Sequence, residues 1–139
     1  MIKEIAMPGG PNITGVGFWE ALDHLVSSSQ VVIDRPRGSR HPRYPEVVYP
    51  LDYGYLYGTT AVDGGGVDLW SGSARERSLD AVLLTVDLNK RDVELKLLLG
   101  CIEDEKQIAL EFLNSGSMHA CLVRRNNFPE NSLRSYDNK

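Results

Sequence analysis

Residues 47–72 read VVYPLDYGYLYGTTAVDGGGVDLWSG, and this stretch decides the fold. Its first half, 47–57, is rich in β-branched and aromatic residues and is interrupted only by Pro50 and Gly54, which predicts a strand. The triple glycine that follows predicts a turn, and residues 67–70 predict a second short strand. The pattern therefore indicates a core built from short strands and glycine turns.

The flanking sequence continues this pattern and adds helices. Further runs of β-forming residues predict strands at 31–33, 81–86, 93–100 and 121–123. Apolar residues at helical spacing predict helices over 18–29 and 103–114, and Gly116 is placed to end the second one. Short strands with a helix near each end predict a small β-barrel flanked by helices.

Length and composition favour one domain in a cytoplasmic protein. The 139 residues fit a single core, which we place at 18–125, between an irregular lead-in at 1–17 and a polar tail at 126–139. A net charge of -4 argues against general nucleic-acid binding. No apolar run reaches the roughly 18 residues of a membrane span, and the first residues lack the apolar core of a signal peptide. The two cysteines lack CxxC spacing, so we expect buried, reduced thiols.

Four aspartates lie at predicted strand ends or turns. Asp63 and Asp68 bracket the triple glycine, and Asp87 and Asp92 bracket a predicted hairpin turn. Carboxylates held close together repel each other, and a bound cation relieves that repulsion. Oxygen ligands favour a hard cation such as Mg²⁺. Taken alone, each aspartate is more often a turn former, because its side chain bonds nearby backbone groups.

A second polar concentration precedes the central stretch. It contains Asp34, Arg35, Arg37, Arg40, His41 and Arg43. Arginines are suited to a polyphosphate anion, although a solvated loop also accommodates them. Tyr49, Tyr53 and Tyr55 alternate along the next predicted strand, where they either belong to the core or line a site.

The central stretch resembles the soluble inorganic pyrophosphatase family, whose members carry YPxNYG, then a threonine, then DGDPxD. The matching residues are Tyr49, Pro50, Asp52, Tyr53, Gly54, Thr59 or Thr60, Asp63, Gly64 and Asp68. Upstream, IDRPRGSRHPRY is similar to the segment with the family's first acid and a phosphate-binding lysine, and Asp34 and Arg43 stand in those places. This upstream segment resembles a short, divergent subgroup more closely. Downstream, Asp87 and Asp92 match two metal-binding aspartates, and Lys96 lies two residues beyond the usual lysine.

The resemblance covers about residues 31–101 and carries expectations for the fold and the reaction. It implies an α+β fold with a closed barrel of about five strands, similar to an OB-fold, and an N-terminal and a C-terminal helix. It implies Mg²⁺-dependent hydrolysis of inorganic pyrophosphate, or a related phosphoanhydride, to phosphate. It also implies a homo-oligomer.

The same resemblance implies roles for individual residues. Metal ligands would be Asp63, Asp68, Asp87 and Asp92, with Asp34 as an outer acid. Asp68, Tyr53 and Lys96 would be catalytic, and phosphate would be contacted by Arg43, Tyr53, Tyr49 and Lys96.

One departure from the family bears on the reaction. Gly65 stands where the family has the middle aspartate of DGDPxD, which orients or deprotonates the attacking water. A general base contributes about 10²- to 10⁴-fold in rate. Two alternatives therefore stay open: a protein that binds a nucleotide or polyphosphate without hydrolysing it, and an assembly protein that uses Phe18, Trp19 and the helix 18–29 as an interface.

Overall fold

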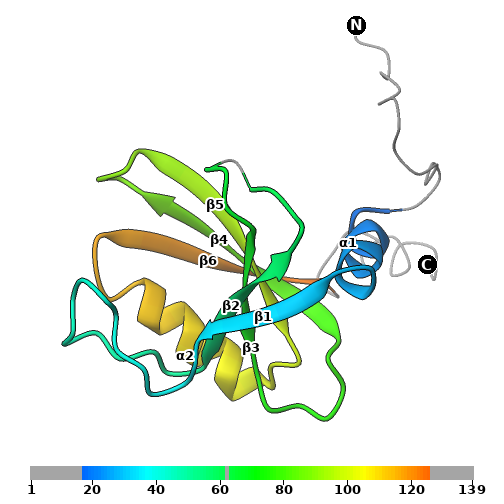
Figure 1. Cartoon of the computed structure of the whole chain (residues 1–139), viewed down its shortest axis with the longest axis horizontal. Helices are drawn as coiled ribbons and strands as arrows, with labels where there is room; N and C mark the ends of the chain where they lie inside the picture. Colours follow the sequence, from blue (N-terminus) through cyan, green and yellow to red (C-terminus); the bar gives the residue numbers. More distant parts are fainter. Residues whose placement is uncertain (1–16, 62, 126–139) are drawn as a thin grey trace, which may run out of the picture.

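The computed structural model describes residues 17–61 and 63–125. The predicted polar tail and all but the last residue of the predicted lead-in lie outside these residues. The elements follow the chain as α1 (Phe18–Ser27), β1 (Gln30–Arg35), β2 (Asp52–Tyr57), β3 (Val67–Ser71), β4 (Leu79–Asp87), β5 (Asp92–Leu99), α2 (Glu103–Leu113) and β6 (Met118–Arg124) (Figure 1). Each predicted helix and strand is present. The strand predicted over 47–57 begins only at Asp52, because Pro50 has no N–H to donate to a ladder.

The strands form one six-stranded mixed sheet in the order β1-β2-β3-β5-β4-β6. All neighbours are antiparallel except β3 and β5, which are parallel and pair at only three positions, from Leu69↔Leu97 to Ser71↔Leu99. The α+β class is therefore as expected. The strand number is six rather than about five, and closure into a barrel is not seen, since no pairing joins β1 to β6 among the described residues.

The two faces of the sheet carry separate apolar clusters. One cluster contains Trp70, Leu83 and Leu98, and the residues of α2 pack against it. The other contains Leu69 and Leu97 and is covered by partly buried side chains of α1. Neighbouring residues of one strand fall into different clusters because successive side chains point to opposite faces. Figure 1 shows α2 lying along β6 and α1 beside the start of β1.

Two expectations about the chain's environment can be compared with the structure. Neither described helix is long and apolar enough to cross a membrane. Cys101 is buried as expected, whereas Cys121 is exposed, so the prediction of two buried thiols is wrong for Cys121. Cys121 pairs with Leu84 across β4 and β6, and Leu84 is itself 39% exposed, which places both side chains on an open part of the sheet.

Gly54 explains why the central stretch requires a glycine after Tyr53. A Cβ at position 54 would lie 1.8 Å from the carbonyl oxygen of Val32 and 2.8 Å from the Cα of Ile33. The β1 backbone therefore lies directly over this position, next to the register shift between Ile33 and Arg35. Any side chain there would push β1, with Asp34 and Arg35, away from the sheet.

We predict that Gly54→Ala destabilises the protein. Overpacking costs about 1–3 kcal/mol and occasionally more, and the obstacle here is backbone rather than a movable side chain. Gly116→Ala is the matched control, because nothing lies within 4 Å of a Cβ at that position. Chemical denaturation should show a large loss of unfolding free energy for Gly54→Ala only; equal effects of the two substitutions would contradict the close approach.

Candidate functional site

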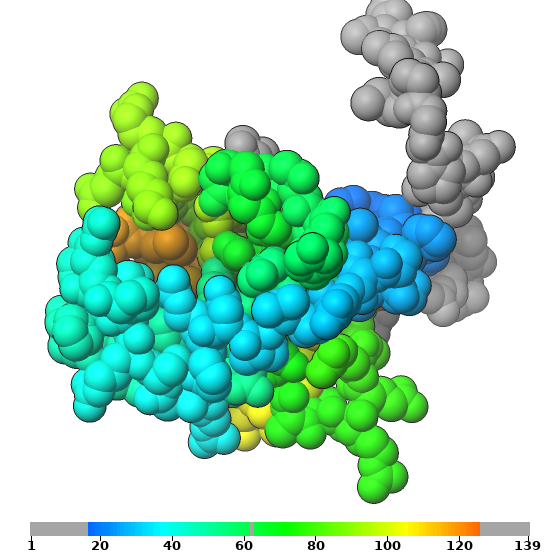
Figure 2. Space-filling model, viewed as in Figure 1, coloured from blue at the N-terminus to red at the C-terminus, as the bar shows by residue number. Residues whose placement is uncertain are grey.

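A polar pocket of about 520 Å³ opens on one face of the molecule. Figure 2 shows it as a hollow between the loop after β1, the β4–β5 hairpin and the start of β6. Every residue predicted for the site lines this pocket except Arg43: Asp34, Tyr49, Tyr53, Asp63, Asp68, Asp87, Asp92 and Lys96. The fold thus brings together side chains that are up to 62 positions apart in the sequence, from Asp34 to Lys96.

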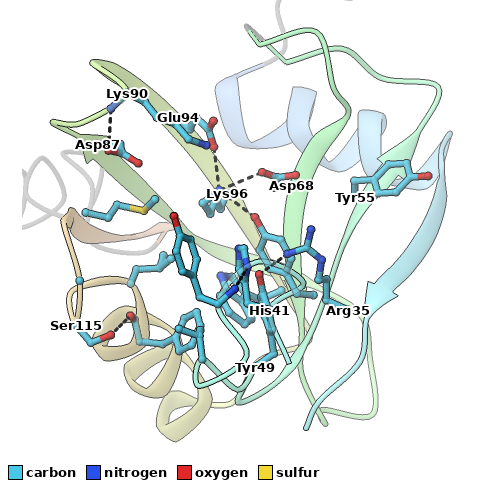
Figure 3. A pocket seen from close by; sticks show the side chains of 18 of the residues that line it. Arg35, His41, Tyr49, Tyr55, Asp68, Asp87, Lys90, Glu94, Lys96 and Ser115 are labelled. Carbon is cyan, nitrogen blue, oxygen red and sulfur yellow. Dashed lines mark hydrogen bonds and ion pairs between the residues drawn. The ribbon is translucent and has the colours of Figure 1, made fainter. Parts of the chain in front are cut away.

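Lys96 is the centre of the pocket's charged network. Its side chain is only 5% exposed. The ammonium nitrogen lies 3.0 Å from the hydroxyl oxygen of Tyr53, 3.0 Å from Asp68 Oδ2 and 2.9 Å from Glu94 Oε1 (Figure 3). An ammonium group has three donors, so these three bonds use all of them.

Strand alternation determines which side chains meet here. Glu94, Lys96 and Leu98 lie on one face of β5 because they are two residues apart. Asp68 and Trp70 share that face of β3, and Trp70 and Leu98 belong to the same apolar cluster. The apolar ends of the two strands are packed together, and their polar ends form the floor of the pocket.

The surroundings of Lys96 keep both it and Tyr53 protonated. Burial raises the pKa of Tyr53 above its ordinary value of 10.0, and the Asp68 carboxylate adds to this although Lys96 acts in the opposite direction. Burial alone would lower the pKa of Lys96, but its interactions with Tyr53 and Asp68 raise that pKa above 10.5. At neutral pH the pocket floor therefore holds a buried ammonium group and a neutral phenol.

A second group of side chains forms the adjoining wall. Arg35 donates a hydrogen bond of 2.6 Å from Nη1 to the hydroxyl oxygen of Tyr49, and the His41 ring stacks on Tyr49 with centroids 6.3 Å apart. Tyr49 is both a core residue and a pocket residue, so the two roles left open for the tyrosines coincide there. Trp70 also lines the pocket, and no described residue accepts a hydrogen bond from its buried indole N–H.

Asp63 and Asp87 act as turn formers in this structure. The backbone N–H of Gly65 donates to Asp63 Oδ1 at 3.0 Å. The N–H groups of Asn89 and Lys90 donate to Asp87 Oδ1 at 3.0 and 3.1 Å. These bonds use one oxygen of each carboxylate, Oδ1, and so a turn role and a role in the pocket are compatible.

Arg43 does not line the pocket. Its backbone N–H donates to His41 Nδ1 within the loop after β1. The arginine that the fold places in the pocket is Arg35, which the sequence showed only as one of four in this segment. Glu94 was also missed; it stands where the resemblance expects the family's lysine, and its spacing of two from Lys96 in a predicted strand was the available signal.

The acidic side chains of the pocket are of the kind that binds Mg²⁺, although they are spread around the pocket. All six acidic side chains that line it offer oxygen ligands only. Across residues 17–61 and 63–125, no three His, Cys, Asp or Glu side chains gather closely enough to hold a metal ion by themselves. Mg²⁺ typically takes one or two carboxylates together with waters and substrate phosphates, so a closed protein cage is not required.

The raised pKa values predict an unusual titration of Tyr53. The pKa values of Tyr53 and Lys96 are both higher in the folded state than in the unfolded state. The contribution of this pair to stability is therefore fully present below the ordinary pKa values, and it is lost as the pH rises through the folded-state pKa values. Tyrosinate absorbance from about pH 9 to 11, around the usual tyrosine pKa of about 10, should be the same for wild type and Tyr53→Phe. One extra group titrating near pH 10 in the wild type would show that Tyr53 is not shielded.

Comparison with known proteins supports the fold assignment alone. No family model matches the sequence, and no curated protein matches it. Among solved structures, an inorganic pyrophosphatase from Neisseria gonorrhoeae is similar with a TM-score of 0.56 and 15% identity, over 78% of this chain and 88% of that one. An inorganic pyrophosphatase from Helicobacter pylori is similar with a TM-score of 0.50 and 16% identity, over 77% of this chain and 92% of that one. The chain therefore has a pyrophosphatase-like fold.

Proposed function

We propose that the pocket binds inorganic pyrophosphate, or a related phosphoanhydride, together with Mg²⁺ and hydrolyses it to phosphate. The observation that carries this proposal is the buried Lys96 ammonium, bonded to Tyr53 at the floor of a pocket lined by carboxylates. Acids alone would repel a phosphate anion. A fixed cation and a neutral phenol among them supply donors for phosphate oxygens.

The proposed phosphate contacts come from several strands of the sheet and from the loop before β2. Lys96 and Tyr53 approach from β5 and β2, and Tyr49, with Arg35 bonded to it, forms the adjoining wall. The unsatisfied indole N–H of Trp70 is a further donor in that wall. The contact from Arg43 stays a prediction that would require movement of its loop.

The proposed metal ligands are Asp63, Asp68, Asp87 and Asp92, with Asp34 as an outer acid. When bound, Mg²⁺ would neutralise phosphate charge and lower the pKa of a coordinated water toward neutrality. In the reaction, the oxygen of water bonds to one phosphorus and the bond from that phosphorus to the bridging oxygen breaks. The bridging oxygen leaves with the other phosphate, which takes up one proton of the water, and the second proton stays on the newly formed phosphate. Lys96 and Tyr53 stabilise the negative charge that grows on the phosphate oxygens.

Phosphate must compete for Lys96 with groups already bonded to it. All three donors of the ammonium group are in use, two of them on carboxylates. When phosphate binds, one of its oxygens therefore replaces Asp68 or Glu94 as a partner of Lys96. Where Asp68 is the one replaced, its carboxylate oxygen becomes free for other roles, including the catalytic one proposed for it.

Binding without hydrolysis is the second candidate function. Gly65 favours it, because this chain lacks the carboxylate that would orient or deprotonate water at that position. Self-association and a cytoplasmic location are further proposals that rest on the resemblance and on the sequence.

Purified protein should release phosphate from pyrophosphate with Mg²⁺ present and should lose this activity in excess chelator. Asp68→Asn should lower the rate by about 100-fold or more, within the range for removal of a catalytic carboxylate. Asp104→Asn is the control, because Asp104 lies exposed in α2 and does not line the pocket. Turnover that is absent in the wild type, or equal in Asp68→Asn, would remove the hydrolase proposal.

Gly65→Asp tests whether one missing carboxylate limits the rate. A Cβ at position 65 meets only Asp63 Oδ1, at the ordinary contact distance of 3.5 Å, so the backbone there accepts a side chain. We expect a rise of about 10²- to 10⁴-fold in phosphate release, whereas the isosteric Gly65→Asn should show none. A flat response with pyrophosphate binding intact, measured by calorimetry, would favour the binding protein.

A further inference from the structure

A second cavity, here called the aliphatic groove, adjoins the polar pocket. It has a volume of about 360 Å³ and shares two of its lining residues, Asp68 and Glu94, with that pocket. Its remaining lining residues are aliphatic, chiefly Leu22, Leu25, Val67, Leu84, Val93 and Leu95. The volume lies within the range of about 300–1,000 Å³ that small-molecule sites occupy.

Topology explains how one pair of acids borders two cavities. The pairing between β3 and β5 begins only at Leu69↔Leu97. The residues before these positions, around Asp68 and Glu94, have no backbone pairing across the two strands, and the side chain of Lys96 joins the two acids there. Val67 and Leu95 point to the α1 side, whereas the acids face the polar pocket, as strand alternation requires.

The lining of the groove indicates what it would accept. Among the described residues that line it, none is aromatic, and the two acids shared with the polar pocket are the only charged ones. A nucleobase is usually held by stacking and by several polar contacts, which this lining does not provide. A saturated or branched hydrocarbon needs only apolar area to contact.

We propose that the substrate is an organic phosphoanhydride: a diphosphate monoester whose phosphates lie in the polar pocket and whose aliphatic group lies in the groove. This inference rests on the proposed function and names the substrate class for the same site. Hydrolysis of such a molecule breaks the P–O–P bridge with one water and yields inorganic phosphate and an alkyl monophosphate. The hydrocarbon is the occupant to which the aliphatic lining of the groove and its shared border with the polar pocket point.

Two probes with the same head group separate the contributions of the two cavities. Methyl diphosphate tests the polar pocket, and n-hexyl diphosphate tests the pocket and the groove together; both are titrated calorimetrically with Mg²⁺ present. Full burial of a methylene is worth about fourfold in affinity. Because the groove is partly open, we expect hexyl diphosphate to bind at least about tenfold tighter than methyl diphosphate.

Leu84→Thr and Val86→Thr form a matched pair of variants. Both residues lie in β4, two positions apart on one face, and they are 39% and 40% exposed. Leu84 lines the groove, whereas Val86 lines neither cavity. Leu84→Thr should reduce the advantage of the hexyl probe by about fivefold and leave methyl diphosphate unchanged, whereas Val86→Thr should change neither.

Three results would overturn the inference, and each has its own signature. If both probes bind equally, the groove takes no part. If the hexyl advantage persists in Leu84→Thr, the hydrocarbon binds elsewhere and the groove has another occupant, such as residues 1–16 of this chain. If neither methyl diphosphate nor pyrophosphate binds, the proposed function itself fails.

Discussion

Lys96 carries a positive charge at a buried position of β5, and the arrangement of the pocket depends on how that charge is balanced. Removing an ammonium group from water is costly unless it is paired and hydrogen-bonded. Tyr53, Asp68 and Glu94 satisfy its three donors from β2, β3 and β5. The network therefore ties together the strands that carry the site, and it supplies the donors that a phosphate would require. The same bonds that stabilise the empty pocket must be exchanged when an anion binds.

The local sequence pattern was sufficient to predict the helices and strands, but it did not predict which strands pair with each other. Alternation and β-propensity located each strand, since these properties depend on neighbouring residues. The parallel pairing of β3 with β5 joins two strands that are separated in the sequence by β4. Nothing in the residues of β3 or β5 specifies this pairing. For the same reason the sequence could not show that β1 and β6 would remain unpaired in the described structure. The expectation of about five strands came from the resemblance, whereas the sequence pattern itself marks six.

The site was predictable where a motif repeats a known spacing, and unpredictable where it departs from one. The spacing of the aspartates and tyrosines brought attention to residues that the fold does gather in one pocket. Arg35, rather than the expected Arg43, lines the pocket; it follows the register shift in β1, and its guanidinium donates to the Tyr49 hydroxyl. Glu94 was overlooked because the resemblance expects a lysine at this position, and no motif marks an acid there. Its bond to Lys96 becomes visible only in the structure.

We propose above all that the pocket around Lys96 binds a phosphoanhydride together with a divalent cation. The most direct measurement is a crystal structure of the protein with the non-hydrolysable analogue imidodiphosphate and Mn²⁺, which is located by its anomalous scattering. We expect phosphate oxygens within hydrogen-bonding distance of Lys96 and Tyr53, with Mn²⁺ bound to carboxylates of the same pocket. An analogue bound elsewhere, or a Lys96 still bonded to both Asp68 and Glu94 in an empty pocket at saturating ligand, would contradict it.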